Sequence, residues 1–248
     1  MRYLFTQSCQ IQATKYLIKH ARYSHTECGI SSTTLEEASK IVEQFVKYLP
    51  KYGWDPVIYT VENGEYPVLD YDLLDEVPKK IKVLKTPIWE PYSIYKKFTG
   101  RKKEDKINSG FLSEKKNPKL LDKLSIWIRG NLFIPDARKF WIKPSVNFLT
   151  NYLKDNPVDV VVSSGPPHSS HIIALKIKEI TKVQWVADFR DPWTNIDYYK
   201  DLLLSKKSDL KHKILENIVL TKADKVITIG ESLSEELTAL GAKNIDII

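Results

Sequence analysis

The chain contains little cysteine and no long apolar run. Two cysteines, Cys9 and Cys28, occur in 248 residues, too few for a disulfide framework and typical of a reducing compartment. The N-terminal segment lacks the continuous apolar core of a signal peptide. Nowhere does an apolar run approach the roughly 18 residues that are needed to cross a bilayer. These absences predict a cytoplasmic protein.

Two ligand-binding signatures are missing as well. No G-x-G-x-x-G pattern follows a predicted strand, so a Rossmann dehydrogenase is disfavoured. His168 and His171 stand close together on a predicted helix, but no further cysteine, histidine or aspartate accompanies them at metal-ligand spacing. The sequence therefore predicts no metal site, and it implies no cofactor.

Positive charge is concentrated in one stretch of the chain. The net charge is +7, and the stretch between Lys96 and Lys123 holds ten lysines and arginines against four acidic residues. The interspersed acidic residues favour a solvated loop, whereas contact with the inner-membrane surface is the functional alternative. Nucleic-acid binding ranks last, because no nucleic-acid motif accompanies the charge.

Hydrophobic periodicity indicates alternating helices and strands. A helix is predicted over 33–50, with a Thr33–Glu36 capping box at its start and Gly53 after its end. The predicted strands are 57–61, 81–86, 158–163, 183–188, 225–229 and 245–248. The other predicted helices are 119–130, 138–154, 167–181, 206–222 and 231–240. This alternation predicts an α/β fold with a Rossmann-like, mostly parallel sheet and helices on both faces.

Two polar loops follow neighbouring strands of this predicted sheet. One runs from Ser163 to His171 (SSGPPHSSH), and the other runs from Asp188 to Trp193 (DFRDPW). In open α/β sheets, ligands bind beyond the carboxyl ends of the strands. Because strands adjacent in the sequence are often neighbours in the sheet, we expect the two loops to converge on one ligand site.

Three charged residues of the second loop are the candidates for catalysis. Asp188 and Asp191 can accept hydrogen bonds from sugar hydroxyls, and Arg190 can hold a phosphate or a carboxylate. A purely structural interpretation remains open, in which the two aspartates fix the turn before Pro192 and Arg190 pairs with one of them. Function is favoured, because polar residues crowd the edge where ligands bind.

The first loop and the end of the second supply candidates for substrate binding. Ser164 lies near a helix N-terminus, where free N–H groups favour anions, and Gly165 lets the backbone approach a ligand closely. His168 is expected to contact substrate, and Trp193 can stack on a sugar ring. His171 is expected to be packed in the interior.

Taken together, these segments resemble the N-terminal domain of bacterial family 4 (group 1) glycosyltransferases, which have the GT-B fold. The similar stretches are FVKYLPKYGWDPVIYTVENGEYPVLD (45–70), TPIWEPY (86–92), IPDARKFWIKP (134–144), SSGPPHSSH (163–171) and ADFRDPWTN (187–195). The resemblance covers about residues 41–248 and is specific as a set.

The resemblance implies one half of a two-domain enzyme. Such enzymes transfer a sugar from a nucleotide-sugar donor to a glycan or lipid-linked acceptor, usually without a metal, in cell-envelope polysaccharide synthesis. Their N-terminal domain holds most acceptor contacts, which implies that Asp188, Arg190 and Asp191 line the cleft. It also implies a location in the cytoplasm, peripheral at the inner face of the membrane. The donor domain is absent from this chain, so we expect no activity from it alone.

The N-terminus departs from the pattern of that family. The family opens with a strand and a glycine-rich loop, but residues 1–32 contain one glycine, Gly29. We therefore expect an atypical segment over 1–32, followed by a Rossmann-like domain over 33–248 with an irregular basic insertion at about 90–150. Either MRYLFTQ (1–7) supplies the first, central strand, or the N-terminus is altered. A non-catalytic binding or scaffold subunit, or a decayed fragment, is the alternative function.

Overall fold

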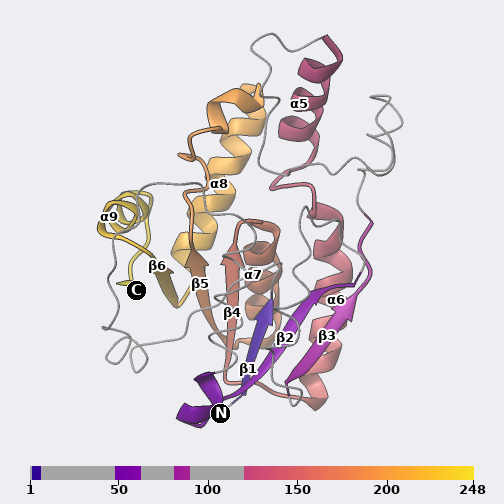
Figure 1. Ribbon diagram of the computed structural model, residues 1–248, viewed down its shortest axis with the longest axis vertical. Coiled ribbons are helices and arrows are strands. Elements are labelled where there is room, and N and C mark those ends of the chain that lie inside the picture. Colours follow the sequence, from indigo (N-terminus) through magenta and orange to yellow (C-terminus); the bar gives the residue numbers. More distant parts are fainter. Residues whose placement is uncertain (1, 7–47, 63–80, 90–119) are drawn as a thin grey trace.

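A computed structural model describes residues 2–6, 48–62, 81–89 and 120–248 of the chain (Figure 1). Seven strands form one sheet: β1 (Arg2–Thr6), β2 (Asp55–Val61), β3 (Lys82–Thr86), β4 (Val160–Gly165), β5 (Gln184–Phe189), β6 (Lys225–Thr228) and β7 (Ile245–Ile247). Their order is β3-β2-β1-β4-β5-β6-β7, and each neighbouring pair is parallel. The prediction of a Rossmann-like parallel sheet flanked by helices is confirmed.

The first strand lies inside the sheet, next to its middle strand β4. Tyr3 of β1 pairs with Pro56 of β2 on one side and with Val160 of β4 on the other. Of the two alternatives for the N-terminus, the structure therefore has the one in which MRYLFTQ supplies the first strand, as Arg2–Thr6, and this strand is interior. From β1 the strands β2 and β3 follow on one side, and β4 to β7 follow on the other. The β1–β4 boundary is therefore the switch point of the sheet.

Helices connect the parallel strands, which cannot be joined by tight hairpins. They are α5 (Leu120–Leu132), α6 (Lys139–Asp155), α7 (Ser169–Thr181), α8 (Lys206–Lys222) and α9 (Glu231–Ala239), with the 3-10 turns η1 (Leu49–Tyr52) and η2 (Tyr199–Leu202). The helices predicted at 119–130, 138–154, 206–222 and 231–240 are confirmed to within about two residues. Among these described helices, none is long and apolar enough to cross a membrane.

Some predicted elements begin later or lie outside the described residues. The strand predicted at 158–163 begins at Val160, where pairing with β1 starts, and the helix predicted at 167–181 begins at Ser169. The Thr33–Glu36 capping box and most of the helix predicted over 33–50 are outside the described residues. Gly53 takes the expected left-handed conformation (φ 78°), and its N–H donates to the carbonyls of Leu49 and Pro50 at the start of η1.

The core lies mainly on the face of the sheet that α6, α7, α8 and α9 cover. The bulky side chains Trp141 of α6 and Trp185 of β5 are fully buried there together with Ile173 of α7. Burying an apolar side chain of this size contributes about 1.5–3 kcal/mol. A second cluster on the strands, which includes Val162 and Val186, packs with Leu49 of η1.

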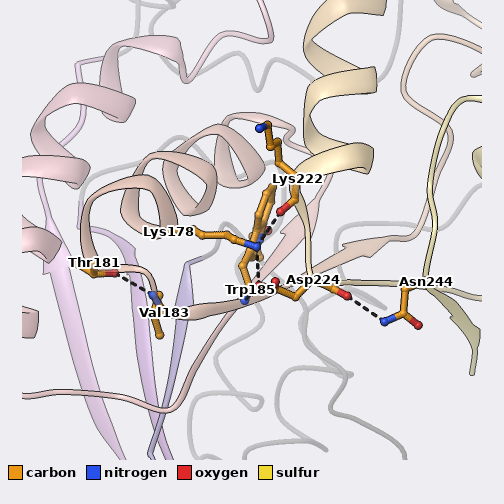
Figure 2. A network of polar contacts seen from close by, with 8 residues as sticks. Lys178, Thr181, Val183, Trp185, Lys222, Asp224 and Asn244 are labelled. Atoms are coloured by element: carbon orange, nitrogen blue, oxygen red, sulfur yellow. Dashed lines mark hydrogen bonds and ion pairs between the residues drawn. The ribbon is translucent and has the colours of Figure 1, made fainter.

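Asp224 fastens the amino ends of β5 and β6 to two helices (Figure 2). Its carboxylate accepts a hydrogen bond from the Trp185 backbone N–H (2.8 Å) and forms an ion pair with Lys178 Nζ (2.6 Å). Lys178, near the end of α7, also donates to the carbonyl of Lys222 at the end of α8. Asn244 donates to the Asp224 carbonyl just before β7. This network stabilises the edge of the sheet opposite to the predicted ligand site.

Candidate functional site

The two polar loops predicted from the sequence do converge. In the β4–β5 ladder Ser164 pairs with Asp188 and Gly165 with Phe189, at the carboxyl ends of both strands. The Ser164 hydroxyl donates to Asp188 Oδ2 (2.7 Å), and the Arg190 N–H donates to the Gly165 carbonyl (3.3 Å). The convergence follows from the parallel register, which brings successive carboxyl ends to one edge.

Asp188 is fully buried, and its carboxylate is engaged inside the protein. Arg190 Nε lies 3.1 Å from Asp188 Oδ1 and 2.9 Å from Oδ2, and Ser164 adds a third hydrogen bond. Burial raises the pKa of Asp188, while the Arg190 guanidinium and the Ser164 hydroxyl oppose that rise. The structural interpretation in which Arg190 pairs with one of the two aspartates is therefore correct, and the partner is Asp188.

Arg190 retains an unused donor group. The side chain is only 7 % exposed, and its Nη2 finds no hydrogen-bond partner among the described residues. A buried, unsatisfied donor on a charged group costs roughly 1–3 kcal/mol or more, so such groups mark places where a ligand or water completes the bonding. Asp188 thus holds Arg190 in place, while the Nη2 group of Arg190 stays buried and unpaired among the described residues.

Asp191 lies beside Arg190 in a group of polar side chains drawn from three segments. Burial raises the pKa of the Asp191 carboxyl, and Arg190 opposes the rise. Burial also raises the pKa of Tyr198; Arg129 of α5 lowers it, and Asp191 and Asp136 raise it further. A partly buried carboxylate, a phenol and two guanidinium groups at one edge can hold a hydroxyl-rich ligand by hydrogen bonds.

The first turn of α7 already holds a carboxylate of the chain itself. Asp136, in the α5–α6 connection, accepts the Ser169 backbone N–H at Oδ2 (2.7 Å) and the Ser169 hydroxyl at Oδ1 (2.5 Å). A negative charge at a helix N-terminus is stabilised by the unpaired N–H groups and the helix dipole. The sequence suggested that an external anion binds near this helix N-terminus. In the structure, the Asp136 carboxylate accepts the hydrogen bonds of Ser169 there.

Two histidines pack around Gly165. His171 is fully buried, as expected, and its Nδ1 lies 2.8 Å from the Ser163 hydroxyl, which accepts from Trp185 Nε1 (2.8 Å). Burial lowers the pKa of His171 to about 3, so the ring is neutral near pH 7. A Cβ at Gly165 would lie 2.5 Å from His171 Nε2 and 3.0 Å from His168 Nδ1. Glycine is therefore required there by the two rings.

His168 and Trp193 stack on one another. Their ring centroids are 4.3 Å apart with an interplanar angle of 1°, and Trp193 Nε1 donates to His212 Nδ1 of α8 (3.1 Å). Trp193, for which the sequence suggested stacking on a sugar, is buried and has one ring face against His168. Burial lowers the pKa of His168 well below its usual value, and the neighbouring His171 and His212 add to this. Nδ1 of the neutral His168 ring finds no partner among the described residues.

Helix α8 supplies supporting residues that the sequence interpretation missed. Glu216 accepts from the Thr194 hydroxyl (2.5 Å) and from the backbone N–H groups of Trp193 and Thr194, each at 3.3 Å. Ser208, His212 and Glu216 recur every four residues on the buried side of α8. That polar stripe at helical spacing was the signal available in the sequence. Asp136 had a weaker signal: it lies in IPDARKFWIKP (134–144), one of the stretches that resemble family 4 glycosyltransferases.

The site offers hydrogen-bonding groups and no cluster of metal ligands. Within the part of the chain that the structure describes, no group of three histidine, cysteine, aspartate or glutamate side chains could hold a metal ion. Buried side-chain atoms without a hydrogen-bond partner among the described residues include Arg190 Nη2, His168 Nδ1 and His171 Nε2. The partly buried Asp191 carboxylate and Tyr198 lie near Arg190. They can orient a polar ligand, and none of them forms a nucleophile–base pair.

No protein-family profile matches the sequence, and no curated protein does. Among solved structures, the sucrose-phosphate synthase of Thermosynechococcus elongatus is similar over the whole of this chain, with 11% sequence identity and a TM-score of 0.46. The match covers 47% of that protein, so the chain spans about half its length.

Proposed function

We propose that this chain is the acceptor-binding half of a GT-B glycosyltransferase. In this proposal the enzyme moves a sugar from a nucleotide-sugar donor to a glycan or lipid-linked acceptor in cell-envelope polysaccharide synthesis. The chain works in the cytoplasm, peripheral at the inner membrane face, and the donor domain completes the active site. Contact with anionic lipid through the stretch between Lys96 and Lys123 belongs to the same proposal; this stretch lies outside the described residues up to position 119.

One observation carries the proposal: Arg190, buried and anchored on Asp188, has an unpaired Nη2 at the ligand-binding edge of the sheet. His168, whose Nδ1 is also unpaired, approaches the same Gly165 that accepts the Arg190 backbone N–H. A rigid guanidinium and a neutral imidazole suit the hydroxyl or phosphate oxygens of a glycan acceptor. The five sequence stretches that resemble family 4 glycosyltransferases add independent support.

Roles follow from burial and pairing. Asp188 positions Arg190 and does not meet the acceptor itself, because its oxygens are occupied and it is fully buried. Arg190 donates hydrogen bonds to the acceptor, and the neutral His168 ring donates or accepts at Nδ1. Asp191 accepts hydrogen bonds from the hydroxyls of the acceptor. Trp193 holds His168 in place by stacking. Ser164 fixes the Asp188 carboxylate by its hydrogen bond.

The test is a titration of the full chain against a sugar-nucleotide panel and lipid-linked glycans extracted from membranes, followed by calorimetry. Asp191→Ala is the informative variant, because Asp191 is partly exposed and removing it leaves the Asp188–Arg190 pair intact. We expect glycan binding that weakens about tenfold or more in Asp191→Ala, as for the loss of a charged hydrogen bond. Asp197→Ala, an exposed aspartate in the same loop, is the control. Equal glycan binding by both variants, or none by the folded wild type, would reject the acceptor site.

The alternative is a binding or scaffold subunit without catalysis. It is favoured by the internal pairing of Asp188 and by the stacking of Trp193 on His168, which leave few groups to act on a reacting bond. Such a subunit binds glycan in the titration but yields no sugar transfer when a donor domain is added. Transfer in the reconstituted mixture would favour the enzyme.

A further inference from the structure

Helix α5 and its surroundings expose large apolar side chains next to the candidate site. Leu124 and Leu132 lie on one side of α5, eight positions apart with Ile128 between them, and Trp127 is adjacent. The surface continues through Phe140 at the start of α6 to Trp89 after β3. We call the five exposed side chains, Trp89, Leu124, Trp127, Leu132 and Phe140, the α5 apolar surface.

Ring contacts join Trp89 and Phe140 to Phe133, the residue that follows α5. Trp89 and Phe140 meet edge to face with centroids 4.8 Å apart, and Phe140 lies 6.0 Å from Phe133. Lys139 Nζ lies over both phenylalanine rings and donates to the Leu132 carbonyl. The aromatic cluster is therefore continuous with the end of α5.

Tryptophan exposure sets this surface apart from the rest of the described chain. Trp141, Trp185 and Trp193 are almost fully buried, whereas Trp89 is 54% exposed and Trp127 is 42% exposed. A tryptophan ring is amphipathic and is favoured at the level of lipid headgroups, where its apolar body is buried and its N–H stays hydrated.

The charge around the α5 apolar surface is predominantly positive. Between positions 120 and 143 there are five basic residues, Lys123, Arg129, Arg138, Lys139 and Lys143, against two acidic ones, Asp122 and Asp136. Asp136 is bonded to Ser169 at the start of α7. Burial lowers the pKa of Lys139, and Lys211 of α8 lowers it further, so the positive charge extends onto α8. Each Lys or Arg near an anionic bilayer contributes about 1 kcal/mol of attraction.

We infer that the α5 apolar surface inserts into the headgroup region of an anionic lipid bilayer. Apolar and aromatic side chains ringed by lysine and arginine match such a bilayer in both charge and polarity. Three of the five basic residues are lysines, which are depleted at protein interfaces, so the basic rim fits an anionic bilayer better than a globular partner. This inference names a surface for the membrane contact in the proposed function. It rests on the proposed function only for the identification of the acceptor as a glycan or lipid-linked molecule.

The position of the surface fits an acceptor presented from a membrane. Figure 1 shows α5 beside the first turns of α8, and Asn131 of α5 bonds both the Leu203 carbonyl and the Ser205 N–H (3.2 and 2.7 Å). Arg129, also on α5, acts electrostatically on Tyr198, which lies near Asp191 of the candidate site. A chain seated on the bilayer through α5 would therefore hold the site close to lipid headgroups.

The test uses the full chain and vesicles, with no sugar nucleotide or glycan present. We expect flotation with phosphatidylcholine vesicles that contain roughly one-third phosphatidylglycerol, and none with phosphatidylcholine alone. Tryptophan emission should shift to shorter wavelength on binding, because Trp89 and Trp127 leave water. The double variant Leu124→Ser/Trp127→Ser should bind about tenfold more weakly or worse, because two apolar anchors are lost.

Two further variants complete the experiment. Ile180→Ser is the matched control, because Ile180 is 55% exposed, neighbours Lys178 and Lys182, and lies at the end of α7. It should bind vesicles as the wild type does. Lys123→Glu/Lys143→Glu should lose binding to anionic vesicles while its melting temperature stays near that of the wild type.

Three outcomes would overturn the inference: no vesicle binding by the folded wild type, equal loss in the Ile180 control, or an oligomer that the Leu124→Ser/Trp127→Ser variant dissociates. The last result would assign the surface to self-association. Because glycan binding is measured without vesicles, vesicle binding can fail while the acceptor site stands, and the reverse is equally distinguishable.

Discussion

The Asp136 carboxylate caps helix α7 at Ser169, a residue 33 positions later in the chain. Oδ2 accepts the Ser169 backbone N–H and Oδ1 accepts its hydroxyl, so one side chain ties the α5–α6 connection to the edge where the candidate site lies. The cap is tertiary, since His168 at the N-cap position makes no side-chain bond of this kind.

Removing this cap should destabilise the protein. For Asp136→Ala we expect the free energy of unfolding to fall by about 1–2 kcal/mol, because an N–H at a helix N-terminus loses its acceptor. Asp136→Asn should lose less, since its amide oxygen can still accept. Urea denaturation followed by circular dichroism measures both. Equal stability of Asp136→Ala and the wild type would show that water replaces the carboxylate at no cost.

Gly165 should tolerate no side chain. In Gly165→Ala the new Cβ would lie 2.5 Å from His171 Nε2, so the buried ring must move, at a cost of about 1–3 kcal/mol. Gly230→Ala is the control, because nothing lies within 4 Å of its Cβ position and its φ of −166° suits any residue. Thermal melting compares the two. The proposed crowding is wrong if both variants melt alike.

The Asp188–Arg190 pair should behave as one unit. Asp188→Ala leaves Arg190 as an uncompensated buried cation and should cost about 3–5 kcal/mol, or prevent folding. The double variant Asp188→Asn/Arg190→Gln should cost less than the sum of its single variants, since each single variant leaves one charge unpaired. Denaturant titrations of Asp188→Asn, Arg190→Gln and the double variant measure the coupling. Additive costs would mean that the pair contributes no net interaction.

Stability should depend on pH through the buried histidines. The folded-state pKa of His171, about 3, lies below its ordinary value of 6.5, so as pH falls below about 6.5 the unfolded state takes up the proton first. The free energy of unfolding therefore falls by up to about 1.4 kcal/mol per pH unit for this residue, until the folded state is protonated near pH 3.

Buried carboxyls act in the opposite direction. The raised pKa values of Asp188, Asp191 and Glu216 let the folded state bind protons more tightly than the unfolded state as pH falls. The measurement is therefore a comparison of wild type with His171→Asn by urea denaturation at about pH 7 and about pH 5. The variant keeps the carboxyls and should lose less stability on acidification. Parallel losses in both proteins would contradict a neutral, buried His171.

Much of the fold followed from local patterns. The alternation of β-branched runs with apolar residues at helical spacing predicted the parallel sheet, and helix α8 was predicted at its observed bounds. The two loops at the carboxyl edge were found by the same logic, because a parallel sheet brings its carboxyl ends together. The start of β4 was predicted two residues too early, because pairing with β1 sets where β4 begins.

The details of the candidate site depended on contacts between distant segments. Nothing near Ser169 in the sequence indicates that Asp136 caps its helix, nor does the sequence near Trp193 point to His212. Likewise, DFRDPW contains two aspartates, and only the burial of Asp188 beneath the loop decides which of them pairs with Arg190.

The sequence by itself determined the fold class, the convergence of two polar loops at the carboxyl edge of the sheet and the residue types gathered there. Periodicity and loop position are local properties, so a single chain suffices to read them. Only the tertiary structure decided which polar groups are consumed internally and which remain unpaired, because burial and pairing arise when segments far apart in the chain pack together. That distinction moves the candidate site from Asp188 and Trp193 toward Arg190, His168 and Asp191.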